Sequence, residues 1–260
     1  MKTTFGRAVV PILAGMCLVS PAGSQTAGNP VGTQGRNEWT LGAVGVYSDH
    51  WLGSERSVSR RILVKSLWGV TDWIDVFALA GGAQMDMKTQ ETGVQDYKGE
   101  YAFAWGGGVN VSLVRHSESR IGVWLAAHAL RFPSSGQFQT TLTVEGEPID
   151  RIFEMHYDSR EFQAEAGITV PLRFLRVYVA GAVWAVQRMD KKKEYLHYSS
   201  FSSFLGEVES EYRSGLWSGG ILGIQIDLPL RYTVTVEGLV FNTDNYRVMV
   251  GVSQTGILAW

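Results

Sequence analysis

The sequence has 260 residues, 45% of them hydrophobic and 18% charged, which is the composition of a folded chain rather than a disordered one. Its 23 basic and 25 acidic side chains give a formal charge of −2, so nothing in the charge balance indicates a nucleic-acid partner. A single cysteine excludes a domain held together by disulfides and a metal site built from several thiolates.

The first 24 residues are predicted to be a secretory signal peptide. Lys2 and Arg7 precede an apolar run over residues 8–19, and the small residues Ala22 and Ser24 then precede the expected cut. The apolar run is too short for a helix that spans a membrane. Residues 25–36 are expected to form a short periplasmic segment before the folded part of the chain, residues 37–260.

An alternative at this end is a lipoprotein, with the lipid attached to Cys17. Met16 disfavours it, because a lipoprotein signal needs Gly or Ala just before the cysteine. After the expected cut the mature chain has no cysteine and 21 basic against 25 acidic residues, a formal charge of −4. No later stretch has the roughly 18 uninterrupted apolar residues of a membrane helix.

Period-two alternation of large apolar with small or polar residues recurs through the rest of the chain, and it is typical of strands with different surroundings on their two faces. In YAFAWGGGVNVSLV, Tyr101 to Val114, one face carries Tyr, Phe, Trp, Val and Leu. The triple glycine here lacks the following Lys-Ser/Thr of a phosphate-binding loop. Ten strands are predicted, at Glu38–Tyr47, Arg60–Val70, Ile74–Met87, Tyr101–Val114, Arg120–Phe132, Glu161–Val170, Arg176–Arg188, Tyr212–Asp227, Tyr232–Phe241 and from Tyr246 onward.

The links between these segments alternate in length, and this indicates two different sides. Short links are expected at residues 71–72, 116–119, 172–175 and 229–230, and longer polar loops at 48–59, 88–99, 133–159 and 189–211. Only the last outer link, Asn242 to Asn245, breaks the alternation. Short periplasmic turns and long outer loops are typical of bacterial outer-membrane barrels.

The fold class predicted is therefore all-β: a closed, antiparallel transmembrane β-barrel of ten strands in an up-and-down meander, located in the bacterial outer membrane. Closure is needed because unpaired strand edges cannot be hydrated within a bilayer. Aromatic residues near the strand ends are expected in the interfacial girdles: Trp68, Trp73, Tyr101, Tyr178, Tyr212, Tyr232 and Tyr246. The alternative fold is a soluble β-barrel with its apolar face inward, which would leave the alternation of link lengths unexplained.

Two stretches carry a resemblance to a known class. KSLWGVTDWIDVFALAGG, Lys65 to Gly82, resembles the hairpin of small outer-membrane barrels of the opacity-protein and OmpA-type class, where a strand ends in an aromatic-Gly-Val/Leu-Thr-Asp turn. The terminal Trp260, with Leu258 two residues before it, is similar to the signal by which the assembly machinery recognises such barrels. Gln254 and Gly256 depart from that signal, so the last strand is expected to stop near Ser253. The resemblance implies fold and location rather than activity.

A ten-stranded barrel has an interior only slightly wider than one that side chains fill completely. The alternation directs eight charged residues inward: Arg61, Lys65, Glu161, Glu165, Arg213, Asp227, Glu237 and Arg247. Mutual neutralisation is the role expected for them, because an unpaired buried charge is costly. The alternative is a narrow channel for ions or small solutes lined by the same groups. Both faces of Ile74–Met87 and Arg176–Arg188 are apolar, so their orientation stays open.

An enzyme is the less favoured possibility, and no catalytic, cofactor-binding or metal-binding residue is predicted. Omptin-type proteases carry paired acidic residues and an Asp–His pair at the outer rim, whereas Asp86 stands alone here and His156 and Asp158 occur in reversed order. His197 lies in a predicted outer loop, where polar residues are the default, and His128 lies inside a predicted strand. These residues alone do not form a catalytic arrangement.

The partners expected are outer-membrane lipid, the barrel-assembly machinery through the last strand, and an extracellular ligand at the long loops. One loop combines Lys191, Lys192 and Lys193 with four aromatic residues, Tyr195, Tyr198, Phe201 and Phe204. Such a surface suits anionic headgroups or a partner protein. The alternative is a solvated run of charge beside the girdle.

Overall fold

The computed structural model describes residues 36–52, 55–88, 96–114, 121–144, 147–173, 175–198, 201–242 and 244–259. The expected signal peptide, residues 1–24, and all but the last residue of the segment 25–36 lie outside the described residues. No helix in the described part of the chain is both long and apolar enough to cross a membrane.

Almost all of the described chain is β-strand. The strands are β1 (Glu38–Leu52), β2 (Glu55–Gly69), β3 (Ile74–Lys88), β4 (Tyr97–Lys98), β5 (Ala102–Val114), β6 (Gly122–Val144), β7 (Glu147–Leu172), β8 (Leu175–Tyr198), β9 (Phe201–Arg213), β10 (Trp217–Leu228), β11 (Tyr232–Asn242) and β12 (Asn245–Ala259). One 3₁₀ turn, η1 (Pro229–Arg231), joins β10 to β11.

Antiparallel pairing runs in a ring through β10, β11, β12, β1, β2, β3, β5, β6, β7 and β8, and the pairing of β8 with β10 closes it. β4 lies off this ring and pairs with β3. β9 and β10 occupy one place in the ring, since β9 pairs with the outer part of β8 and β10 with its inner part. The chain between them, Ser214–Leu216, is not strand. The prediction of a closed barrel with ten strands in its wall is confirmed.

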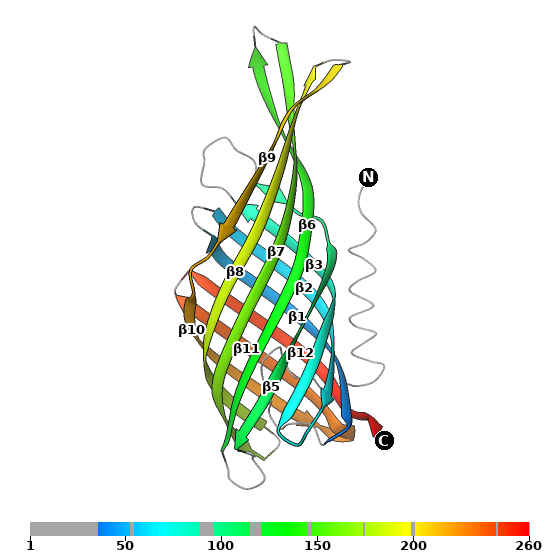
Figure 1. Ribbon diagram of the computed structural model, residues 1–260, viewed down its shortest axis with the longest axis vertical. Helices are drawn as coiled ribbons and strands as arrows, with labels where there is room; N and C mark the ends of the chain where they lie inside the picture. Colours follow the sequence, from blue (N-terminus) through cyan, green and yellow to red (C-terminus); the bar gives the residue numbers. More distant parts are fainter. Residues whose placement is uncertain are drawn as a thin grey trace.

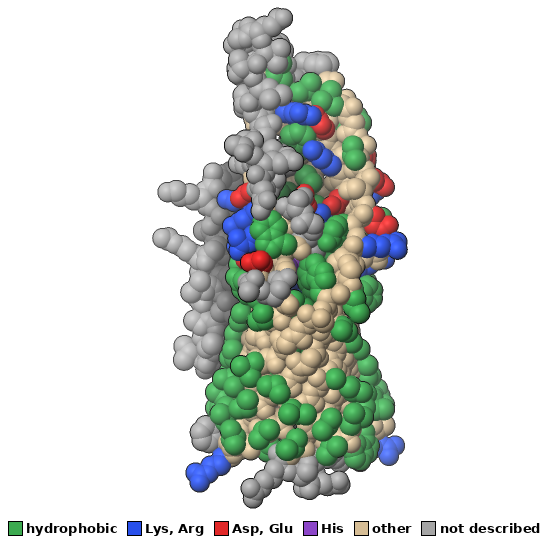
Figure 2. Space-filling model, turned by 90° about the vertical axis from the view of Figure 1, so that its left-hand side faces the viewer, with side chains coloured by type: hydrophobic (Ala, Val, Ile, Leu, Met, Phe, Trp, Pro, Cys, Tyr) green, Lys and Arg blue, Asp and Glu red, His purple; other side chains and the backbone are tan. Residues whose placement is uncertain are grey.

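The wall separates an apolar outside from a packed inside, as the alternation predicts. On β5 the side chains of Phe103 and Trp105 are exposed, as is that of Tyr101 just before the strand, while Ala104 and Asn110 are buried. Figure 2 shows hydrophobic side chains over the lower wall, with charged side chains gathered above them. Because lipid is the solvent that suits such a belt on a closed antiparallel barrel, the protein spans a bilayer, and in bacteria barrels of this kind belong to the outer membrane.

The barrel wall is much taller on one side than on the other (Figure 1). β6, β7 and β8 have 23, 26 and 24 residues, and with β9 they rise beyond the belt as a sheet, here called the projecting sheet. Longer polar loops were expected at residues 133–159 and 189–211. This is wrong, because the described residues of both ranges, 133–144, 147–159, 189–198 and 201–211, lie in paired strands. The expected loop at residues 48–59 is likewise mostly strand from β1 and β2.

Two other expectations need correction. Tyr178 and Tyr232 do not lie in an interfacial girdle, because their side chains are buried, whereas Trp68, Trp73 and Tyr101 are exposed as predicted. The last strand does not stop near Ser253 but continues to Ala259, where it pairs with Glu38. The side chains of Leu258 and Trp260 lie outside the described residues.

Candidate functional site

The interior of the barrel is the candidate site, and its central group is the carboxylate of Glu161 on β7. Arg61, on β2 across the lumen, donates from Nη1 to Oε2 at 2.8 Å and from Nη2 to Oε1. Arg247 on β12 donates from Nη2 to Oε2 at 2.8 Å. One carboxylate therefore joins arginines from two other parts of the wall, with the paired geometry that makes such bonds strong.

The same chain of contacts continues along β7. Arg247 also donates from Nη1 to Oε1 of Gln163 at 2.7 Å, and the Gln163 amide donates to Glu165. Glu161, Gln163 and Glu165 alternate with outward residues, so the period of the strand places all three inside. Five polar side chains thus connect β2, β7 and β12.

Lys65 and Glu237 lie in the same space. The ammonium of Lys65 sits 4.0 Å from the centre of the Phe77 ring, and the carboxyl groups of Glu165, Asp75 and Glu237 act on it electrostatically. Tyr178 donates its hydroxyl to Oε2 of Glu237 at 2.7 Å.

Glycine gives the Tyr178 ring its place on the inner wall. A Cβ at Gly223 on β10 would lie 2.0 Å from the Tyr178 ring, so only glycine leaves room for it there.

Large side chains fill the interior around these charges. Trp124, Trp184, Phe132 and Leu239 are each at most 2% exposed. The guanidinium of Arg61 lies 4.4 Å from the Phe132 ring centre, and that of Arg247 lies 5.2 Å from the Trp184 ring. The six charged residues Arg61, Lys65, Glu161, Glu165, Glu237 and Arg247 are between 1% and 4% exposed, so solvent does not reach them.

Gly108 of β5 belongs to this packing. A Cβ at Gly108 would lie 2.6 Å from the Phe77 ring and 2.7 Å from the Cβ of His128. His128 points inward beside Phe77, at 6.5 Å between ring centroids. Glycine at position 108 therefore makes space for side chains of the neighbouring strands β3 and β6.

A second polar cluster lies at the end of the barrel from which the projecting sheet rises. Arg188 on β8 donates from Nη2 to Glu55 of the β1–β2 hairpin at 2.8 Å and to Asp190 at 2.7 Å. Its guanidinium also lies 5.0 Å from the ring of Tyr157, which meets Tyr97 of β4 edge-on. Burial raises the pKa of Asp190, and the hydrogen bonds from Arg188 act in the opposite direction. This cluster links the projecting sheet to the opposite rim.

The structure brings six of the eight predicted interior charges together and leaves two out. Asp227 lies at the inner rim, where it pairs with Arg176 at 2.7 Å and its side chain is 30% exposed. Arg213 is not in the lumen, because its side chain is 72% exposed and pairs with Glu211 at 2.8 Å. Its placement was wrong because the non-strand residues 214–216 reverse the alternation between β9 and β10.

Among the buried charged side chains of the interior, sequence reasoning missed Asp75 and Arg188. Asp75 on β3 is fully buried, but its strand is apolar on both faces, so alternation gave it no orientation. Arg188 is 3% exposed at the mouth, and its strand has the same ambiguity. In both cases the sequence offered one indication, a charged residue within a strand that is apolar on both faces.

The residues weighed as parts of an enzyme have other partners. Asp86 pairs with Arg60 at 2.7 Å, and Asp158 pairs with Arg131 at 2.8 Å. The His156 ring contacts Ser135 at 2.7 Å through Nδ1, on the exposed face of the projecting sheet. Within the described residues no third group bonds to that ring, and no cluster of three ligands could hold a metal ion.

The lysine run predicted as a basic loop lies on β8 and is divided between two faces. Lys191 pairs with Glu209, and Lys193 lies 4.0 Å from Glu207, both on β9. Lys192 points to the other face, 4.2 Å from the Phe153 ring. Tyr195 and Phe204 pack together at 5.4 Å, while the side chains of Tyr198 and Phe201 lie outside the described residues.

Comparisons with known proteins give similarity of fold. No family model matches the sequence, and no curated protein matches it. The chain is similar to the outer membrane protease OmpT from Escherichia coli (TM-score 0.49, 10% identity, 90% of this chain and 99% of that one). It is also similar to the translocator domain of the autotransporter NalP from Neisseria meningitidis (0.46, 10%, 95% and 92%) and to the toluene transporter TbuX from Ralstonia pickettii (0.31, 11%, 84% and 88%). The three differ in what they do, and the likeness concerns the fold alone.

Proposed function

We propose that this protein is a closed outer-membrane barrel with a structural and surface-interaction role, and that the projecting sheet is the part that meets partners outside the cell. The observation that carries the proposal is the packed interior, where six charged side chains are at most 4% exposed. A barrel filled in this way serves as a rigid support. The outward part is then available for binding.

The chemistry of the projecting sheet fits this role. Phe204, Leu205 and Val208 on β9 are between 51% and 64% exposed, next to the Lys–Glu pairs of β8 and β9. Apolar side chains set among charged ones are typical of protein interfaces. The mature chain of this proposal begins after residue 24, and its last strand, β12, is the part that the assembly machinery would engage.

A narrow channel remains the second candidate, because charges of both signs do line the lumen. Conduction requires groups that solvent can reach. Salt bridges that cross the lumen, such as Arg61–Glu161 and Arg188–Glu55, favour the closed barrel instead. We propose no catalytic activity, since Asp86, His156 and Asp158 each bond to a different partner.

The first expected result concerns closure in the membrane. The protein extracted from outer membranes should migrate faster on a gel when unheated than when boiled, because a closed barrel resists detergent until heat opens its strand pairing. The measurement is gel mobility of membrane and periplasmic fractions. Recovery in the soluble periplasmic fraction, with one mobility, would contradict a membrane barrel.

The second expected result concerns orientation. The proposed mature chain lacks cysteine, so single cysteines can report exposure at the cell surface. In intact cells a bulky polyethylene-glycol maleimide should modify Val208→Cys on β9 but not Asp72→Cys in the short link between β2 and β3. Both positions are exposed on the protein itself, so both should react after the cells are broken. The reverse pattern in intact cells would invert the topology.

A further inference from the structure

A row of arginines crosses the outer face of the wall where the projecting sheet begins. Arg131 on β6 is paired in register with Arg160 on β7, Arg160 with Gln187 on β8, and Gln187 with Arg213 on β9. The three arginine side chains are 46%, 42% and 72% exposed. Like charges placed opposite each other on paired strands are destabilising. A bound anion would offset this repulsion.

Two carboxylates neutralise this row only in part. Asp158 takes two hydrogen bonds from Arg131, at 2.9 and 2.8 Å, and Glu211 takes one from Arg213 at 2.8 Å. Among the described residues, the nearest acidic contact of the Arg160 guanidinium is Asp158 at 3.8 Å. Three guanidiniums therefore share two carboxylates, and Arg160 keeps donors for an anion from outside.

The height of the row matches the level of lipid headgroups. Trp105 on β5 is the register partner of Arg131 and is 52% exposed. Tryptophan is enriched at the boundary between hydrocarbon and headgroups. Directly below, the outward residues of the same strands are apolar, and directly above they include Asp158 and Glu211.

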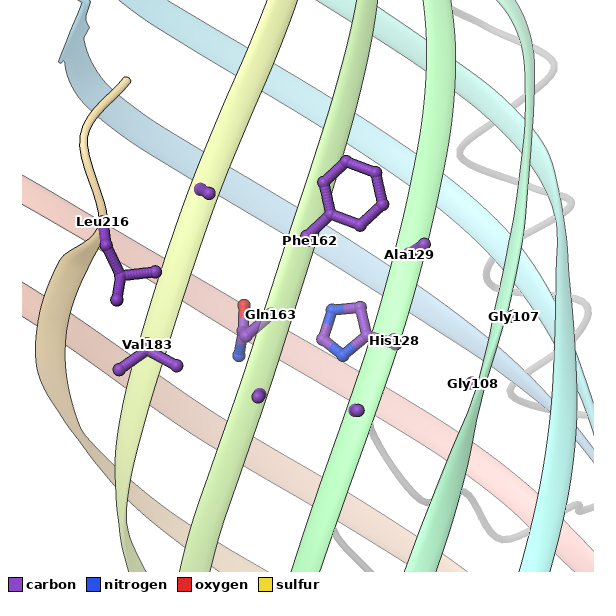
Figure 3. Close-up of a pocket in the computed structure, with 11 residues that line it drawn as sticks. Gly107, Gly108, His128, Ala129, Phe162, Gln163, Val183 and Leu216 are labelled. Carbon is purple, nitrogen blue, oxygen red and sulfur yellow. The ribbon is translucent and has the colours of Figure 1, made fainter. Parts of the chain in front are cut away.

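Immediately below the row the wall is hollowed by a furrow of about 460 Å³. Its floor consists of the small residues Gly107, Ala127, Ala129, Ala164 and Ala185, and larger side chains stand around it. Phe162, Val183 and Leu216 are labelled at its borders in Figure 3. Leu216 is 73% exposed and lies at the break between β9 and β10. The surface of the furrow is almost wholly apolar, as an acyl chain requires.

We propose that the arginine row and the furrow together bind one anionic lipid of the outer leaflet, with its headgroup phosphate on Arg160 and Arg213 and an acyl chain in the furrow. The fork of a guanidinium matches phosphate oxygens, and such charge-assisted bonds are strong. Charge complementarity above and an apolar groove below select a lipid over a soluble anion. The inference rests on the proposed orientation of the barrel, with the projecting sheet outside.

The test measures lipid retained by the folded protein. Purified wild-type protein in detergent, mixed with diphosphoryl lipid A, should keep one lipid in native mass spectrometry, and should not keep phosphatidylcholine, whose headgroup has no net charge. The double variant Arg160→Gln/Arg213→Gln should weaken retention about tenfold or more. Ala164→Trp, which fills the furrow and keeps the arginines, should weaken it as well.

Arg60→Gln is the matched control. Arg60 is an outward arginine on β2 that is 47% exposed and paired with Asp86. The outward residues below it are the large apolar Ile62 and Val64, whereas small residues form the furrow below the arginine row. This variant should retain lipid like the wild type. Equal loss in Arg60→Gln, or displacement of the lipid by glucose 6-phosphate, would overturn the site. Loss of lipid specificity in a protein that still shows heat-dependent mobility and surface labelling would refute this inference alone and leave the proposed function standing.

Discussion

Replacing Glu161 by glutamine should lower the free energy of unfolding by about 3 to 5 kcal/mol, because the change leaves Arg61 and Arg247 without their shared counter-charge in a place that solvent does not reach. The amide keeps the size and one acceptor oxygen, so the loss reports charge rather than packing. The measurement is equilibrium unfolding by denaturant of protein refolded into lipid vesicles.

Asp227→Asn is the control for this change. Asp227 is also an acid paired with an arginine, but it is 30% exposed at the inner rim, and solvent screens the pair. Its loss should therefore cost less than about 1 kcal/mol. Equal effects of the two changes would show that the interior is wet, and the closed barrel would then be wrong.

In a planar bilayer the wild-type protein should pass little or no steady current, because side chains fill the lumen between the Arg61–Glu161–Arg247 centre and the Arg188 cluster at the mouth. Glu161→Gln should leak and favour anions, since two positive charges then lack their carboxylate. Single-channel recording with reversal potentials in a salt gradient measures both properties.

Trp184→Ala separates charge from bulk in the same experiment. Trp184 stacks on Phe241 at 5.0 Å and meets Trp217 edge-on at 4.9 Å, so its removal opens space without changing charge. Any current that leaks through Trp184→Ala should lack the preference for anions that is expected of Glu161→Gln. Large and stable currents through the wild type would replace the closed barrel with a channel.

The alternation of apolar and polar residues predicted most of the inward-facing side chains, because lipid requires apolar side chains on the outer face of each strand. On β7 the acids Glu161 and Glu165 have one parity and Phe162 the other, so the charged face could only be the lumen. Where both faces of a strand are apolar, as around Asp75 and Tyr178, the pattern carries no orientation, and both side chains proved to be buried. The inward Tyr178 was thus mistaken for a girdle residue.

The projecting sheet could not be predicted in the same way. Beyond the belt both faces meet water, so the contrast between faces fades and polar strands are read as loops. The pairing of Lys191 with Glu209 is a cross-strand contact that only the register reveals. The position of Arg213 depended on three non-strand residues, and no periodic pattern locates such a break.

The seam of the barrel joins the two ends of the folded chain, since Glu38 of β1 pairs with Ala259 of β12. No earlier portion of the chain can complete the ring, so every shorter nascent length presents two unsatisfied strand edges. Contacts between residues so distant in sequence make folding slow, and the chain is prone to aggregation until the barrel has closed. A truncation of β12 should therefore leave the ring open, and immunoblots of membrane fractions should find the shortened chain degraded rather than inserted.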